Sequence, residues 1–565
     1  MPVLVSYAPT YLANRSTETD LRVLPGLLAA FVHRETAHPL TAPLADVAER
    51  LLDEPLGASQ RILLGSLAYY LLWTGQTVRL DRLIVKIDRL CVSEEVAPAT
   101  LFRWYGVGVL IRSLRGRVDE ALDYAQRALG LAASGPPPLR CKAHLLMMLA
   151  ALAGRDTAMA RTHLQQAAED LDINNLIDTT TYEFQRSLLT MLERDWRSAA
   201  QLMRAAVTSG QASGWPLREH IALLGQTLAA TQVGALDEAE RTLQAVVAHR
   251  FYAVCRWHQW LAGLIEAHLA ERRADRPRCL AALARAFAVG RAFGYDFGPM
   301  PYCCGDMMPR LAALALEHDI DTAFATAIIR RYALPAPLGA DEQWPWPLRI
   351  RTMGHFVIER DEPGGKASRK ESRKPLDLLK LLLALGAAPV PVARLCAALW
   401  SDAEGDAARN SFDNALHRLR KLLGGDRHVQ LLSGGVSLNP ATCWHDVAAL
   451  NACFARMDQP TADDGSAHGL ALADRVLALY QGDFLAGEDD LPDVVAARER
   501  LRLRFARQMG AHGARLEAAG DLDAATLLYR RIVEQHPLAE AIYRRLIVCL
   551  LVRGQRAEAY EVYRR

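Results

Sequence analysis

The sequence predicts a mainly α-helical protein in which a long α-solenoid is followed by a small α+β domain and a second helical-repeat domain. Three observations lead to this fold class. A helical template recurs about every 40 residues in the first half of the chain. A break rich in proline and tryptophan then introduces short β-type segments, and a stricter 34-residue repeat follows near the end. At 565 residues the chain is also too long for one hydrophobic core.

The first template is a small residue at a turn, followed by small or apolar residues five, nine and twelve positions later. "GRVDEALDYAQRAL" from Gly116 and "GALDEAERTLQAVV" from Gly234 carry it most clearly. The same spacing starts, with a slip of one residue at the last of these, at Gly75, Arg194, Ala274 and Gly154. Such a period indicates stacked helical pairs, and we assign residues 1–335 to the solenoid. The predicted core positions are Leu80, Ile84, Ile87, Ala121, Ala125, Ala128, Ala199, Met203, Ala206, Ala239, Leu243, Val246, Cys279, Leu283 and Ala286.

A curved helical array offers a concave surface for a small-molecule or protein effector. Aromatic side chains on first helices could line it, namely Tyr69, Trp73, Trp104, Tyr105, Trp257 and Trp260. Side chains of this kind more often fill grooves between repeats, and we favour that role. In "PYCCGDMMP", Tyr302–Pro309, two cysteines and two methionines could suggest a soft-metal site. Adjacent cysteines point in different directions, so a loop is the favoured interpretation.

Residues 336–347 contain "WPWP", a break suited to a linker. From 348 to 445 the pattern predicts paired strands in "LRIRTMGHFVIER", a helix ending at Gly386, and a shorter helix ending near Trp400. A polar loop, "SDAEGDAAR", leads to a third helix in "RNSFDNALHRLRKLLGG", and "HVQLLSGGVSLNP" reads as a hairpin around Gly434 and Gly435. Strands, three helices and a closing hairpin are the parts of a winged helix-turn-helix domain.

The third helix separates into two faces when its residues are placed 100 degrees apart. Phe412, Leu416, Leu419 and Leu423 form the predicted buried stripe, flanked by Ala415 and Leu422. The opposite face carries the base-reading candidates Asn410, Asn414, His417, Arg418 and Lys421. Amides can pair with adenine edges, and cations with guanine edges or phosphates. The alternative is an ordinary solvated face.

Basic residues are concentrated in this region. Between 348 and 440 there are fifteen Lys and Arg against ten Asp and Glu, while the rest of the chain has 51 against 54. Five of the seven lysines, Lys366, Lys370, Lys374, Lys380 and Lys421, lie here. A basic domain inside a neutral chain is one feature of nucleic-acid binding.

The last repeat has the tetratricopeptide period. Gly520 is followed by Ala525, Tyr529, Ile532 and Pro537, and the template restarts at Gly554 with Ala559 and Tyr563. The sequence given stops within the second helix of that repeat, so we expect either a further segment or a partner to cover its apolar face.

Several ordered motifs resemble one bacterial family. "LRIRTMGHFVIER", "KPLDLLKLLLA", "LCAALW", "ARNSFDNALHRLRKLLGG" and "VQLLSGGVSLNP" look like the OmpR-type winged helix of the antibiotic-regulatory-protein (SARP) activators. "YQGDFLAGEDD" and "AARERLRLRFARQM" are similar to the start of that family's bacterial transcriptional activation domain, which we assign to 446–565. The chain departs from the family at Leu491–Val495, where an aromatic residue is usual, and in placing a long solenoid before the winged helix.

The resemblance implies roles for residues at matching positions. The third helix would enter the major groove, and Ser433, Gly434 and Gly435 would form the wing at the minor groove or backbone. Arg409 and Arg420 would hold phosphate, as would Arg373 and Lys374. Residues 401–408 would touch RNA polymerase. These expectations make double-stranded DNA and RNA polymerase the partners, with a possible homodimer on DNA.

Other classes of function lack their motifs. There is no G-x-x-x-x-G-K-[ST] loop, G-x-S-x-G elbow or H-E-x-x-H pair, so we expect neither an enzyme nor a cofactor. The start shows no signal-peptide pattern, no apolar run is long enough to span a membrane, and ten scattered cysteines lack a C-x-x-C pair. A cytoplasmic DNA-binding transcriptional regulator is the favoured hypothesis. The alternative is a helical scaffold that keeps the winged helix for protein contacts.

Overall fold

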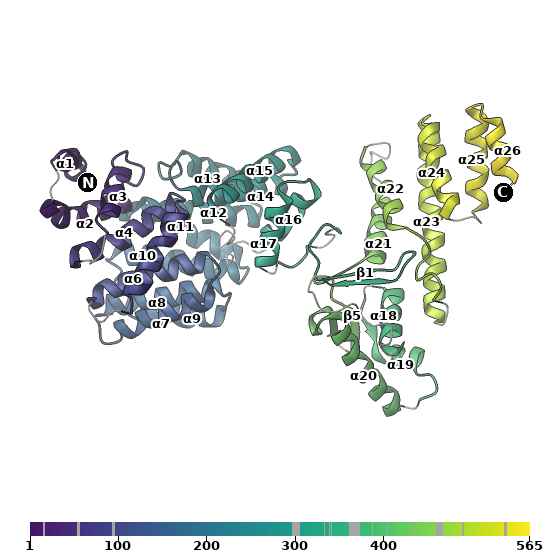
Figure 1. The fold of residues 1–565 in the computed structure, drawn as a ribbon, viewed down its shortest axis with the longest axis horizontal. Helices are drawn as coiled ribbons and strands as arrows, with labels where there is room; N and C mark the ends of the chain where they lie inside the picture. The colour runs from purple at the N-terminus through teal and green to yellow at the C-terminus, as the bar shows by residue number, and fades with distance from the viewer. Residues whose placement is uncertain are drawn as a thin grey trace. The chain divides into compact units, whose positions relative to one another are not determined.

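The computed structural model describes residues 1–14, 17–52, 57–92, 96–295, 306–332, 334–337, 340, 342–360, 373–386, 388–403, 405–432, 434–458, 467–488, 491–535 and 539–564. The protein is mainly α-helical, as the sequence predicts. It forms two compact units, Met1–Leu334 and Pro335–Arg565 (Figure 1).

The first unit consists of helices, most of them joined in antiparallel pairs by short turns (Figure 1). They are α1 Pro2–Ala13, α2 Thr17–Arg34, α3 Thr41–Arg50, α4 Ala58–Trp73, α5 Thr77–Leu90, α6 Pro98–Leu114, α7 Val118–Ala132, α8 Pro137–Ala153, α9 Thr157–Glu169, α10 Leu176–Leu192, α11 Trp196–Ser213, α12 Pro216–Val233, α13 Leu236–Ala248, α14 Arg256–Arg272, α15 Arg276–Phe293, α16 Met307–Glu317 and α17 Thr322–Arg331.

In the six pairs from α4–α5 to α14–α15 the turn contains one residue in the left-handed backbone region, and the turn between α16 and α17 contains two, Asp319 and Asp321. Gly75, Gly116 and Gly234 adopt this conformation, which costs glycine little because it has no Cβ. The other pairs use non-glycine residues, namely Arg155 (φ 59°), Arg194 (φ 64°) and Ala274 (φ 59°). The turn of the third pair is therefore at Arg155, and the one-residue slip expected from Gly154 disappears.

Outer and inner helices of the stack differ in which sides they bury. Every core position that the template predicts on the outer helices α5, α7, α11, α13 and α15 is buried. The inner helices α4, α6, α8, α12 and α14 bury residues on nearly all sides; α14 buries almost every residue from Trp257 to Ala270. A helix that is apolar all round must be covered all round. None of the helices in the described part of the chain is nevertheless long and apolar enough to cross a bilayer.

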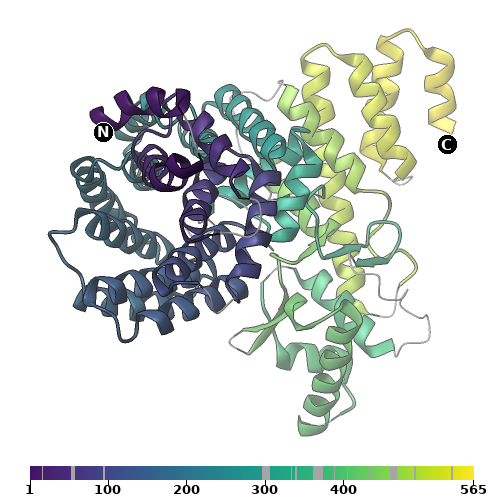
Figure 2. The ribbon, with the colours of Figure 1, turned by 60° about the vertical axis from the view of Figure 1, so that its left-hand side comes forward.

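The cover comes from the curvature of the stack, which brings early and late repeats together (Figure 2). Helix α4 packs against α14, where the ring of Trp73 lies 6.3 Å from that of Trp257 and 5.9 Å from that of His258. Helix α2 packs against α12, and Arg34 donates to the carbonyls of Ser213 and Gly214. The first unit is thus a superhelix whose inner helices close on themselves.

One segment of this unit differs from its sequence-based interpretation. Met307 and Met308 are buried in the first turn of α16, so the end of "PYCCGDMMP" is helical rather than a loop. A methionine pair on an apolar helix serves the core. Cys303 and Cys304 lie outside the described residues.

The second unit starts with the α+β domain, residues 342–445. Its elements are β1 Leu348–Arg351, β2 Val357–Arg360, α18 Arg373–Leu385, β3 Val390–Pro391, α19 Val392–Leu399, α20 Gly405–Leu423, the 3-10 turn η1 Asp426–His428, β4 Val429–Leu432, β5 Gly435–Leu438 and β6 Cys443–His445. One sheet has the order β2-β1-β6, with β1 antiparallel to β2 and parallel to β6. The other has the order β3-β5-β4 and is antiparallel throughout.

The proline-tryptophan break packs into this unit rather than acting as a free spacer. Trp344 and Trp346 are 2% and 5% exposed. Arg349 on β1 donates to the carbonyls of Glu342 and Trp344 at 3.2 and 2.9 Å. The two large aromatic side chains bury apolar area in this unit, which holds the segment against it.

The C-terminal helical domain completes the second unit (Figure 1). It comprises α21 Asp446–Met457, α22 Ala467–Leu479, α23 Pro492–Ala518, α24 Leu522–Gln535, α25 Glu540–Val552 and α26 Arg556–Arg564. Gly520 and Gly554 hold left-handed turns, and Ala525, Tyr529 and Ile532 are fully buried, as the repeat predicts. Pro537 lies outside the described residues.

The strained turn at Ala274 can be relieved by substitution. Ala274 is exposed, so Ala274→Gly removes no packing while it removes the Cβ clash of the left-handed conformation. We expect a gain of about 0.5–1 kcal/mol in the free energy of unfolding, measured by chemical denaturation. The matched control is Ala281→Gly at an exposed position inside α15, which should cost about 1 kcal/mol. An equal loss of unfolding free energy in Ala274→Gly and Ala281→Gly would show that the turn at Ala274 is not strained.

Candidate nucleic-acid interface

Helix α20 is attached to the α+β domain by one apolar face. Phe412, Leu419 and Leu423 are completely buried, Ala415, Leu416 and Leu422 are at most 8% exposed, and α18 packs against this stripe. The predicted buried face is confirmed. The helix begins at Gly405, so the first turn lies within the segment expected to be a loop. Asp406 lies in that first turn, where a carboxylate is stabilised by the positive end of the helix dipole. This residue indicated the start of the helix, but the polar composition of the segment favoured a loop.

The opposite face of α20 is exposed, as predicted. It presents Asn410, Asn414, His417, Arg418 and Lys421 to solvent. Asn414 donates one amide hydrogen to the carbonyl of Asn410 at 2.9 Å, which directs its side chain along the helix. Between Gly405 and Leu423 there are four cations and two acids, so the helix is locally basic.

The two arginines expected to hold phosphate have different surroundings. Arg409 is 51% exposed, pairs with Asp413 one turn later at 3.3 Å, and lies over the ring of Phe412. Arg420 is only 26% exposed and donates to the carbonyl of Val429 at 3.3 Å, with Asp426 at 3.7 Å. Arg420 therefore links the end of α20 to the first wing strand, a positioning role that spacing alone did not reveal.

The remaining phosphate candidates lie at the start of α18. Arg373 is 70% exposed, with Asp377 at 3.9 Å. Lys374 donates to the carbonyl of Leu399 at 2.7 Å, and its ammonium lies 5.8 Å from the ring centre of Trp400. Lys374 thus caps the C-terminus of α19, and both cations are exposed.

The hairpin of β4 and β5 forms the candidate wing. Gly434 has φ +80°, and its carbonyl accepts a hydrogen bond from the backbone of Val392 at 3.1 Å. A Cβ at Gly435 would lie 2.9 Å from that of Pro389, so glycine allows β5 to approach the segment before α19. Leu431 and Leu432 are about half exposed on β4. Ser433 lies outside the described residues.

The α+β domain is joined to the C-terminal helical domain through a buried carboxylate that sequence reasoning missed. The Asp446 carboxylate accepts hydrogen bonds from the hydroxyl and backbone N–H of Thr352 and from the backbone N–H groups of Met353 and Val447, at 2.5 to 2.9 Å. Burial raises the pKa of Asp446, and the four donors oppose that shift. One side chain thus connects the end of β1 to the start of α21.

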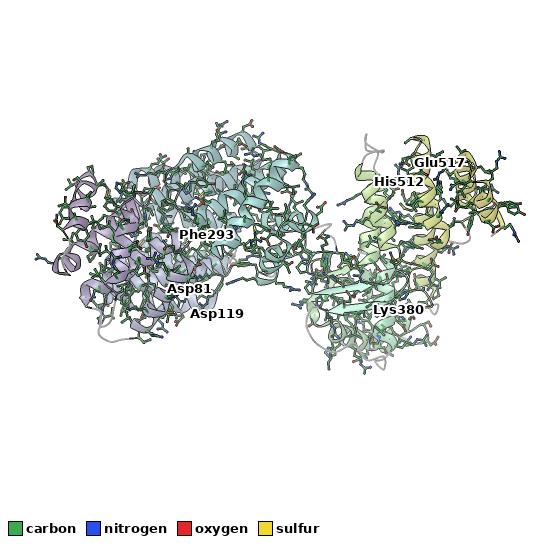
Figure 3. The ribbon with its side chains drawn as sticks, turned by 45° about the horizontal axis from the view of Figure 1, so that its top comes forward. Asp81, Asp119, Phe293, Lys380, His512 and Glu517 are labelled. Carbon is green, nitrogen blue, oxygen red and sulfur yellow. The ribbon has the colours of Figure 1, made fainter. Side chains whose placement is uncertain are left out.

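A second connection runs between α18 and the C-terminal helical domain. Lys380 lies in the second unit (Figure 3). It is 8% exposed, and its ammonium lies 2.6 Å from Glu488 and 3.9 Å from Asp377. Arg500 on α23 donates to the carbonyl of Ala384 at 2.9 Å. Lys380 was part of the basic count, but its charge is used inside the unit and contributes little to the exposed surface.

The C-terminal part of the chain matches a known family. The profile of the bacterial transcriptional activator domain matches residues 445–565, which points to a bacterial transcriptional activator. No curated protein sequence matches the chain.

Two solved structures show distant likeness. The apo form of RapI is similar with a TM-score of 0.32 and 7% identity over 55% of this chain and 85% of that protein. Aspartyl phosphate phosphatase F from Bacillus subtilis is similar with a TM-score of 0.31 and 11% identity, over 57% and 90% of the two chains. Similarity at this level carries no argument about function.

Removing the Asp446 carboxylate should destabilise the second unit. Asp446→Ala leaves three buried backbone N–H groups and one hydroxyl without their acceptor, so we expect a loss of about 3 kcal/mol or more in the free energy of unfolding. Chemical denaturation followed by tryptophan fluorescence measures it. The control Asp426→Ala removes an 82% exposed carboxylate and should change stability by less than about 0.5 kcal/mol. Similar small effects would show that Asp446 is not an anchor.

Proposed function

We propose that the protein is a sequence-specific DNA-binding transcriptional regulator, an activator of the SARP-like type, whose α+β domain is an OmpR-type winged helix. The observation that carries the proposal is the exposed amide and cation face of α20, which lies opposite a leucine stripe and before a glycine hairpin. The adjoining match to the bacterial transcriptional activator domain supports it.

The proposed contact places α20 in the major groove. From Asn410 to Lys421 the helix rises about 16 Å, which corresponds to about five base pairs. Asn410 and Asn414 would pair with adenine edges, while His417, Arg418 and Lys421 would reach guanine edges or phosphates. Arg409 and Arg373 would hold the backbone, with Arg420 and Lys374 contributing beside their contacts inside the domain, and the wing at Gly434 would lie along the adjacent strand.

Further partners follow from the same proposal. RNA polymerase would contact residues 401–408, and two copies of the chain could bind tandem sites. The helical repeats of the first unit would receive an effector, either a small molecule or a protein. The proposed role requires no cofactor and no enzymatic step. A protein that binds chromosomal DNA would act in the bacterial cytoplasm.

A protein scaffold is the second candidate. Tyr560 and Tyr563 on α26 are 61% and 76% exposed, and Leu551 and Val552 at the end of α25 are about half and two thirds exposed. Apolar side chains gathered at one end of a helical domain favour a protein contact. A scaffold would not need the cations of α20 to bind DNA, so the two candidates differ in DNA affinity.

A salt titration of the full chain on random genomic duplexes tests the electrostatic part. We expect log K to fall linearly with log salt, because phosphate contacts release counterions. Arg409→Gln should reduce the slope by about one. Arg544→Gln is the matched control, since that exposed arginine also pairs with an acid one turn away, Glu540, but lies on α25. Absent or salt-independent binding would exclude the activator and favour the scaffold.

Sequence preference is tested by Asn414→Ala. The loss of a bidentate contact with one base should cost about 1–3 kcal/mol at the preferred site and relax the preference at that position. Duplexes selected by the full chain from a random pool provide the site, and competition with single-base variants measures the preference. Asn174→Ala, in the exposed turn before α10, is the control for loss of an amide. If Asn414→Ala left the base preference unchanged, Asn414 would not be a base-contacting residue.

A further inference from the structure

The closed superhelix of the first unit encloses a pocket. A cavity of about 70 Å³, which opens to solvent, lies between the inner helices α4, α6, α8, α10, α12 and α14. The pocket exists because α4 meets α14, so the wall has contributions from residues nearly two hundred positions apart.

Most of the wall is apolar. Of the six aromatic residues considered as ligand contacts, Tyr69, Trp73 and Trp257 line this pocket, and Trp215 joins them. Leucines and an isoleucine complete the apolar part. Trp104, Tyr105 and Trp260 are not part of the wall and are buried among the helices, as the groove-filling interpretation expects. The groove-filling role therefore holds for these three residues, while a ligand role for Tyr69, Trp73 and Trp257 stays a prediction.

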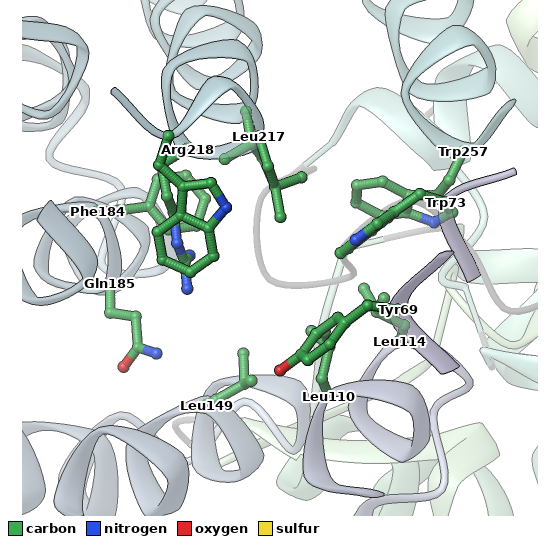
Figure 4. A pocket seen from close by; sticks show the side chains of 12 residues that line it. Tyr69, Trp73, Leu110, Leu114, Leu149, Phe184, Gln185, Leu217, Arg218 and Trp257 are labelled. Atoms are coloured by element: carbon green, nitrogen blue, oxygen red, sulfur yellow. The ribbon is translucent and has the colours of Figure 1, made fainter. Parts of the chain in front are cut away.

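Polar groups face the pocket from two sides. In Figure 4 the polar ends of Arg218 and Gln185 on the left and of Tyr69 on the right border the same open space, and Trp73 lies beside Tyr69. The Arg218 guanidinium stacks 4.9 Å from the ring of Trp215, which fixes its position. Gln185 is 5% exposed, and its side-chain oxygen accepts no hydrogen bond. A buried amide oxygen without a partner costs free energy unless something supplies a donor.

The surroundings of the pocket carry positive charge. His33 lies edge-on to Tyr69 and Trp215, at 5.5 and 5.7 Å between ring centres. Burial, followed by the charges of Arg103, Arg34 and Arg218, lowers the pKa of His33 to about 4. Among the described residues that line the pocket there is one cation, Arg218, and no carboxylate. The local field therefore favours an anion.

We propose that this pocket binds a small organic anion with a flat apolar body, such as an aromatic carboxylate that also carries a hydrogen-bond donor. The apolar body would lie between the tryptophans and leucines, the acid group would pair with Arg218, and the donor would satisfy Gln185. The proposal builds on the signal-receiving role of the helical repeats and gives that role a ligand class. Since α4 and α14 both contribute to the wall, an occupant would join the first and last parts of the closed array.

Two fluorescent probes that share one ring system test the proposal on the full chain. 1-Anilinonaphthalene-8-sulfonate carries an anionic group, and N-phenyl-1-naphthylamine lacks it. Arg218→Met should weaken the binding of the sulfonate about tenfold or more, because a charge-assisted contact is lost, and change the neutral probe less than about threefold. Leu149→Trp, which fills the pocket, should weaken both probes.

The control is Arg241→Met on the exposed face of α13, which should leave both affinities unchanged. If Arg218→Met loses helicity, Gln185→Leu replaces it, with weaker binding of both probes expected, because both carry an amine N–H that would donate to Gln185. Sulfonate binding that is the same in wild type and in these variants would overturn the anion site. Probe binding that survives Leu149→Trp would overturn the pocket. Binding is measured without DNA, so either result is separate from the DNA titrations.

Discussion

The contact of α4 with α14 determines the character of the first unit. Once Trp73 reaches Trp257 and His258, the inner helices have neighbours on every side and must be apolar on every side. Residues about 180 positions apart become parts of one core. The same contact encloses the pocket lined by aromatic residues, into which Arg218 and Gln185 bring polar side chains. A buried polar group usually has a hydrogen-bond partner, and one without a partner needs an explanation such as ligand binding.

The second unit is organised around buried charges rather than curvature. Helix α20 is held on the domain by its apolar stripe and by Arg420, so the residues of its outer face are not needed for packing. Behind it, Asp446 and the pair of Lys380 and Glu488 fasten the α+β domain to the C-terminal helical domain. Asp446 is buried, so loss of its carboxylate would leave several buried donors unpaired, whereas Glu488 is 40% exposed and its pair with Lys380 is the weaker of the two connections. A contact on the C-terminal helical domain would thereby reach α20 through α18.

Much of this architecture is legible in the sequence because it is local. The 40-residue template located the turns, and its spaced small residues are the buried ones. The α20 wheel separated Phe412 and its neighbours from Asn414 and Lys421 correctly. The errors concern non-local or disguised features. Arg155 holds a left-handed turn that the sequence template assigned to Gly154. The contact between α4 and α14, which closes the stack of helices into a ring, has no periodic pattern in the sequence. Asp446, Lys380 and Arg420 resemble surface charges until the fold supplies their partners.

Ring closure also limits how this chain can vary. An open array of helical pairs can gain or lose a unit at little cost, because each pair touches only its neighbours. Here the pair that begins with α4 must meet the pair that begins with α14, and Arg34 must meet the turn before α12. Removing or adding forty residues would carry every one of those partners out of reach. The number of repeats is therefore part of the fold, as strand number is in a closed β-barrel.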